Sequence, residues 1–194
     1  MIDFKKDIID YYDTLSKTFS LLNIEEINRT LNFLVDAHKK EKTIYVFGNG
    51  GSSATASHMV CDFNKGISAP LTKKMNLICL SDNIPMMTAI ANDISYDDIF
   101  LFPLIGKIKS GDVIIAISGS GNSKNIIKAV EYGKDNGAII IGMTGYNGGA
   151  LLPLSDYKLH APINDMMKSE DVHMTFDHMI MTILSSFLKA NQNT

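Results

Sequence analysis

Histidines and carboxylates stand at helical spacing in two parts of the chain, and they are the residues best suited to chemistry. His58 and Asp62 are four residues apart, so a helix there puts both on one face. Near the C-terminus, in "SEDVHMTFDHM", Glu170 and His178 share a helix face at positions i and i+8. Each of two predicted helices therefore offers an acid and a histidine.

Three interpretations of these residues compete. One carboxylate and one histidine could form an acid/base pair, or two histidines and two carboxylates could bind Zn²⁺ or a similar ion. Alternatively, the residues form a solvated helix face or include a core histidine, and His173 and Asp177 lie at the border of the apolar stripe. A straight helix rises about 12 Å over eight residues. Glu170 and His178 therefore meet at one ion only if Glu170 lies on an irregular first turn or another subunit supplies a ligand.

Two glycine- and serine-rich stretches, "GNGGSS" (48–53) and "SGSGNS" (118–123), each follow an apolar run and precede a helical pattern. At the carboxyl ends of parallel strands, such loops present backbone N–H groups and helix N-termini to an anion. Ser118, Ser120 and Ser123 would add hydroxyl donors. Neither stretch matches GxxxxGK[ST] or GxGxxG, which argues against an ATPase and a dinucleotide enzyme. The pair favours a phosphorylated small molecule over the alternative of simple strand–helix turns.

The elements that must position these residues alternate along the chain. Two helices are expected over residues 3–40, followed by strands at 43–47, 76–81, 112–118, 138–145 and 157–162. Helices are expected near 52–64, 122–136 and 169–189. Because the strands are continuous apolar runs, they predict a parallel sheet covered on both faces. We therefore expect an α/β protein, a three-layer α/β/α sandwich with a five-stranded parallel sheet, as one domain over 1–194.

Composition narrows the class of protein. The chain has 194 residues and a net charge of −3 with no basic block, which argues against a nucleic-acid surface. Two cysteines, Cys61 and Cys79, lack CxxC spacing and are expected to be structural thiols in a reducing compartment. The N-terminus has no signal-peptide core, and no apolar run reaches membrane-spanning length. We expect a cytoplasmic protein that binds neither nucleic acid nor membrane.

The segments "GNGGSSATASH", "SDN…ANDISYDDIF", "ISGSGNSKNIIKA" and "SEDVHMTFDH" together resemble the SIS (sugar isomerase) domain family. Within that family they are similar to the phosphoheptose isomerases, over nearly the whole chain. The resemblance implies a flavodoxin-like fold and a homotetramer with active sites between subunits, in which the helical extension 1–40 serves oligomer packing. It also implies interconversion of sedoheptulose 7-phosphate and D-glycero-D-manno-heptose 7-phosphate, for the heptoses of lipopolysaccharide, capsule or other surface glycans.

The resemblance also assigns roles to individual residues. The phosphate would be bound by Ser118, Gly119, Ser120 and Ser123, and the sugar by Asn49, Gly51, Ser52, Asn92, Asp93 and Glu170. One zinc ion per subunit would be held by His58, Asp62, Glu170 and His178. We expect proton transfer through a cis-enediol, with Asp62 as base and His178 as acid.

The chain departs from the family pattern at several positions, and at one of them "NKG" (64–66) stands where an arginine segment is common. Asp62 stands where a glutamate is usual, Glu170 where a glutamine is usual, and Met167 where an aspartate is usual. The ligand set is thereby more anionic, which favours a dication. The alternatives are a non-catalytic SIS module that binds a sugar phosphate or docks on a protein, as the DnaA-associating type does, and an isomerase of another sugar phosphate.

Overall fold

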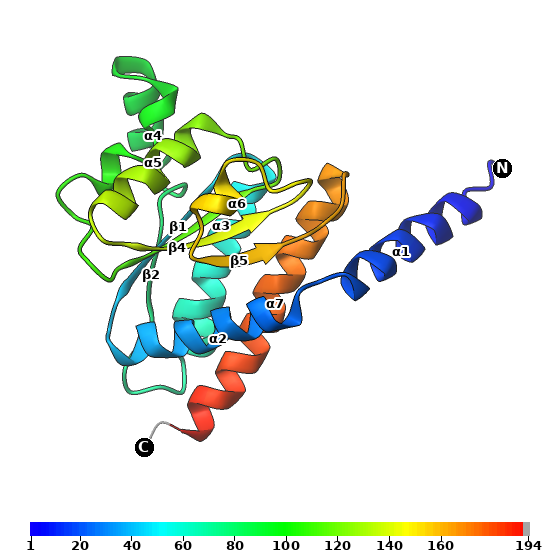
Figure 1. Ribbon diagram of the computed structural model, residues 1–194, viewed down its shortest axis with the longest axis horizontal. Helices are drawn as coiled ribbons and strands as arrows, with labels where there is room; N and C mark the ends of the chain where they lie inside the picture. The colour runs from blue at the N-terminus through cyan, green and yellow to red at the C-terminus, as the bar shows by residue number, and fades with distance from the viewer. Residues whose placement is uncertain (192–194) are drawn as a thin grey trace.

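The computed structural model describes residues 1–191, in which five parallel strands form one sheet of order β2-β1-β3-β4-β5 (Figure 1). The strands are β1 (Thr43–Gly48), β2 (Asn76–Cys79), β3 (Val113–Ser118), β4 (Ile139–Thr144) and β5 (Tyr157–His160). β3 is buried along its whole length, as a central strand covered on both faces must be. The predicted α/β architecture and the five predicted strands are confirmed.

Helices cover both faces of the sheet (Figure 1). One face carries α2 (Ile24–Lys39), α3 (Gly51–Cys61) and α7 (Met166–Ala190), and the other carries α4 (Ile84–Asp93), α5 (Lys124–Asp135) and the short α6 (Leu151–Leu154). Successive strand residues point to opposite faces. Val46 therefore packs on the α3 and α7 side, whereas Phe47 packs on the α4 and α5 side.

The strand order places two of the loops side by side. β1 pairs with β3, and Gly48 at the end of β1 lies opposite Ile117 near the end of β3. Because the chain turns to one edge after β1 and to the other after β3, this is the switch point of a 2-1-3-4-5 sheet, where ligands bind. The glycine- and serine-rich loops after β1 and β3 both lie at this point.

Some elements were not predicted. α4 and α6 do not appear in the expected pattern, and α3 passes into a π-helical turn, η1 (Asp62–Ile67). Two short 3₁₀ turns, η2 (Tyr96–Asp98) and η3 (Phe102–Leu104), lead towards β3. No helix of residues 1–191 is long and apolar enough to cross a membrane.

The first helix, α1 (Lys5–Ser20), projects from the rest of the molecule (Figure 1). The hydroxyl of Tyr11 on α1 donates a hydrogen bond of 2.5 Å to the Asp171 carboxylate on α7. This hydrogen bond raises the pKa of Tyr11 to about 12. The next helix begins at Ile24, and the Asn23 side chain caps it by accepting from the Glu26 backbone N–H at 3.1 Å.

Candidate active site

The loops after β1 and β3 are joined by a hydrogen-bond network around Asn49. Its amide exchanges two hydrogen bonds with the amide of Asn125 on α5, with N···O distances of 3.0 and 2.9 Å. The Tyr96 hydroxyl also donates to the Asn49 side-chain oxygen at 3.0 Å. Asn125 is buried, so Asn49 is held in one orientation at the switch point.

The loop after β3 has the hydroxyls of an anion site. Ser118 accepts from the Gly121 N–H at 3.1 Å, and its Oγ lies 3.4 Å from the Oγ of Ser123. The Ser120 hydroxyl accepts from the Asn122 N–H at 3.2 Å. Ser123 is the N-cap of α5, but its side chain makes no capping hydrogen bond. The Ile126 N–H already donates to Asn125 Oδ1 at 2.9 Å, so the first-turn N–H groups of α5 that could serve an anion are those of Lys124 and Asn125.

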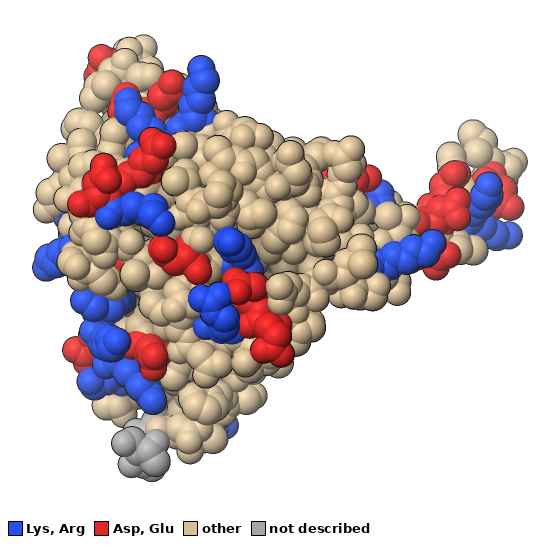
Figure 2. All heavy atoms as spheres, in the orientation of Figure 1, with Lys and Arg blue, Asp and Glu red and all other residues tan. Residues whose placement is uncertain are grey.

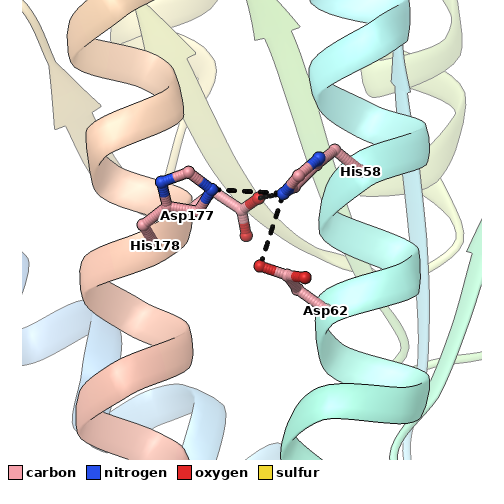
Figure 3. A group of neighbouring side chains, drawn as sticks. All are labelled: His58, Asp62, Asp177 and His178. Carbon is pink, nitrogen blue, oxygen red and sulfur yellow. Dashed lines mark hydrogen bonds and ion pairs between the residues drawn. The ribbon is translucent and has the colours of Figure 1, made fainter.

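A second group of side chains lies between α3 and α7 (Figure 3). His58 and Asp62 come from α3 and the start of η1, and Asp177 and His178 come from α7. One donor atom from each of the four lies within 4.8 Å of the other three. The Nε2 atoms of His58 and His178 are 3.1 Å apart, and Asp62 Oδ2 is 3.5 Å from His58 Nε2.

Asp177 is the buried member of this group. Its side chain is fully buried, and neither carboxylate oxygen has a hydrogen-bond partner among the described residues. One oxygen lies 4.0 Å from His58 Nε2. Burial raises the pKa of the Asp177 carboxyl to about 7, with Asp62 adding to the rise and His178 opposing it. A buried carboxylate beside a second acid and two imidazoles is the setting of a metal site, because a cation would balance its charge.

Glu170 does not lie beside His58, Asp62 and His178, the other three predicted metal ligands. α7 runs unbroken from Met166 to Ala190, so Glu170 and His178 remain two turns apart. The Glu170 carboxylate instead lies against Gly51 at the start of α3, where a Cβ would be 2.6 Å from either carboxylate oxygen. The structure thus brings three of the four predicted ligands together and places Asp177 beside them.

The remaining predicted residues lie around the same edge of the sheet. Gly51 and Ser52 begin α3, directly after the β1 loop. Asn92 and Asp93 end α4, exposed and hydrogen-bonded to each other at 2.8 Å. α4 packs against η2, whose Tyr96 holds Asn49. His173 is separate, since it is fully buried beside the Thr144 backbone and His160.

Three residues of the site escape sequence reasoning. Asn125 is an amide on an otherwise ordinary helix, and Tyr96 lies in a 3₁₀ turn far along the chain from Asn49. Asp177 falls at the border of the apolar stripe of α7. The sequence shows only that Asp177 precedes His178. Whether the Asp177 side chain points towards His58 depends on how α7 packs on α3.

Comparison with known proteins gives a matching family model and full-length relatives. The family model described as "SIS domain" matches residues 8–145. A phosphoheptose isomerase of Helicobacter pylori (strain Shi470) is 32% identical over 195 residues and is covered, like this chain, in full. A protein of Thermoplasma acidophilum named a probable phosphoheptose isomerase is 37% identical over 84% of this chain and 89% of its own length.

Two solved structures have the same fold. They are phosphoheptose isomerase GmhA of Neisseria gonorrhoeae, with a TM-score of 0.85 and 22% identity, and a phosphoheptose isomerase of Francisella tularensis, with 0.86 and 23%. Each alignment covers 95% of this chain and all of the other. With the matched family model and full-length relatives above 30% identity, the chain belongs to the SIS domain family.

Proposed function

We propose that this chain is a phosphoheptose isomerase, an aldose–ketose isomerase that interconverts sedoheptulose 7-phosphate and D-glycero-D-manno-heptose 7-phosphate. The observation that carries the proposal is the histidine–carboxylate group on the helices that flank two anion-ready loops. Relatives of full length that bear this name support the choice of substrate.

The two loops suit the two ends of a sugar phosphate. The phosphate binds at the α5 N-terminus, to Ser118, Gly119, Ser120 and Ser123 of the loop that leads into this helix. The sugar hydroxyls bind along the β1 loop and the adjacent helix ends, in a set comprising Asn49, Gly51, Ser52, Asn92, Asp93 and Glu170. Asn49 is already oriented by its amide partner, so it loses little freedom on binding.

The reaction needs one group to move a proton between adjacent carbons and another to serve the oxygens. Asp62 removes the proton from the carbon next to the carbonyl, which gives a cis-enediol, and returns it to the neighbouring carbon. His178 supplies a proton to the carbonyl oxygen and takes one from the adjacent hydroxyl. Asp62 and His178 face each other across the gap between α3 and α7 (Figure 3).

A divalent cation fits this site, because two imidazoles and two carboxylates gather there and one carboxylate is buried without a partner among the described residues. Nitrogen and oxygen donors of this kind suit zinc. His58, Asp62 and His178 would hold the ion, which supplies Lewis-acid polarisation of the sugar carbonyl when bound. We propose one such ion per chain.

The proposal is tested by incubating the protein with sedoheptulose 7-phosphate in D₂O and following the sugar by NMR. The expected result is aldose formation, with deuterium at the carbon that receives the proton in the fraction of turnovers in which the proton held by Asp62 exchanges with solvent. Asp62→Asn and His178→Gln should each reduce turnover at least about 100-fold, while Asp135→Asn, on exposed α5 surface, should not. Tight binding of the sugar phosphate without turnover or exchange would instead favour a non-catalytic binding module.

A further inference from the structure

We propose that Asp177, and not Glu170, is the second carboxylate ligand of a divalent metal site formed with His58, Asp62 and His178. The inference deepens the proposed function, on which it rests for the identity of the site. Metal binding can nevertheless be measured whether or not the sugar turns over. Glu170 is thereby left to the sugar.

The packing of α3 on α7 determines which acid reaches the histidines. Gly51 on α3 lies against Glu170 on α7, and His58, seven residues further, lies against Asp177, also seven residues further. The two helices therefore run side by side in a fixed register, in which residues at equal distances along the two helices face each other. A rise of about 10 Å along each helix separates the Glu170 level from the His58 level. Asp177 is at the level of His58, and Glu170 is two turns away.

The burial of Asp177 demands a partner that the described residues do not supply. The side chain is fully buried, both oxygens lack hydrogen-bond partners among residues 1–191, and the carboxylate points into the gap between the helices (Figure 3). A buried carboxylate without a donor is costly. Asp62 across the gap is a second acid, so the two carboxylates repel each other until a cation lies between them.

The four donor atoms are already close to the spacing that one ion imposes. Donors about 2.1 Å from zinc lie at most about 4.2 Å from one another, and here the four lie within 4.8 Å. Small side-chain rotations close the difference. The two histidine nitrogens at 3.1 Å already have the spacing of neighbouring ligands.

The test compares two matched amide substitutions, Asp177→Asn and Glu170→Gln, in full-length protein freed of metal by a chelator. Zinc titration by calorimetry should give near one ion per wild-type chain. Asp177→Asn should weaken zinc binding at least tenfold and shrink the zinc-induced rise in Tm, while its metal-free Tm stays equal or rises. Glu170→Gln should change zinc affinity less than threefold. Equal losses, the reverse order, or a wild-type protein that binds no zinc would overturn the inference.

A spectroscopic variant keeps the test valid even if Asp177→Asn fails to fold. In D177C, Co²⁺ should bind the new thiolate and give a cobalt–thiolate charge-transfer band, which E170C should lack. Wild-type protein sets the baseline for the native Cys61, which is exposed on α3. A band in E170C and none in D177C would assign the ligand to position 170. Zinc binding as described but without turnover would count against the proposed function and leave this inference standing.

Discussion

At the residue scale, the site depends on side chains that hold other side chains. Asn125 is 2% exposed and is not among the predicted substrate-binding residues, yet it forms both amide–amide hydrogen bonds of Asn49. It also accepts from the Ile126 N–H at the start of α5 at 2.9 Å. Asn125 therefore links the β1 loop to the N-terminus of α5, where we propose that the phosphate binds, and we predict that it is a positioning residue.

We predict that Asn125→Ala weakens binding of the sugar phosphate about tenfold, because two hydrogen bonds of about 1 kcal/mol each no longer orient Asn49. Tyr96→Phe removes only the third bond to Asn49 and should have a smaller effect. Calorimetric titration of both variants checks the order. Equal affinity in Asn125→Ala and wild type would show that Asn49 does not need this support.

His173 gives a second prediction, for stability against pH. Burial lowers the pKa of His173 to about 4, His160 adds to that shift, and the nearby Thr144 backbone opposes it. The unfolded chain takes up this proton near pH 6.5 and the folded chain only near pH 4. The stability from a neutral His173 is therefore complete above about pH 6.5 and falls by about 3 kcal/mol as pH drops to about 4.

Urea unfolding of chelated protein at about pH 7.5 and about pH 5 measures this slope. His173→Leu should flatten it, whereas His160→Gln should leave most of it, since His160 is only partly buried. A slope that persists in His173→Leu would assign the acid sensitivity to other groups.

At the element scale, the sequence was informative wherever a pattern repeats along one element. The five strands are continuous apolar runs, and the two loops are rich in glycine and serine, so the fold and the place of both loops at the carboxyl ends of strands could be predicted. The ligand role that we propose for Asp177 could not be predicted, because the position of Asp177 beside the two histidines depends on the register between α3 and α7 rather than on spacing within α7. The π turn that begins at Asp62 was not predicted either, because no residue pattern in the sequence marks it; in the structure this turn packs on α7.

The loop after β3 packs on the loop after β4, and Gly121 is one of the residues in contact. Its φ is +66°, and a Cβ there would lie 2.0 Å from the backbone oxygen of Gly148. We predict that Gly121→Ala destabilises the protein by more than about 2 kcal/mol, through both strain and a backbone clash. The same change should abolish phosphate binding.

Gly106→Ala is the matched control, because Gly106 has a similar φ of +71° but no atom lies within 4 Å of the place that an added methyl group would occupy. Gly106→Ala should lower the free energy of unfolding by about 1 kcal/mol, which is the cost of placing an alanine at positive φ without any clash. Chemical denaturation of both variants gives the difference, which measures the contact between the two loops. Similar losses in the two variants would mean that the Gly148 backbone moves aside freely.

At the scale of the whole molecule, α1 has apolar side chains that the rest of the chain does not cover. Figure 2 shows it standing away from the main body, with basic and acidic side chains along it. Phe4, Ile8, Ile9 and Tyr12 are each more than half exposed. An isolated 16-residue helix is marginal in water, and an apolar stripe of this size is typical of a protein interface.

We propose that this stripe packs between copies of the chain, and we expect a homotetramer of about 86 kDa from chains of 21.4 kDa. Ile8→Asp puts a charge at the centre of the stripe and should yield smaller species by light scattering at micromolar concentration. Lys17→Asp puts a carboxylate half a helical circumference away and should leave the mass unchanged. If subunits complete the site, turnover of the sugar phosphate should fall with the mass in Ile8→Asp. A wild-type monomer, or an Ile8→Asp variant of unchanged mass, would show that α1 is not the interface.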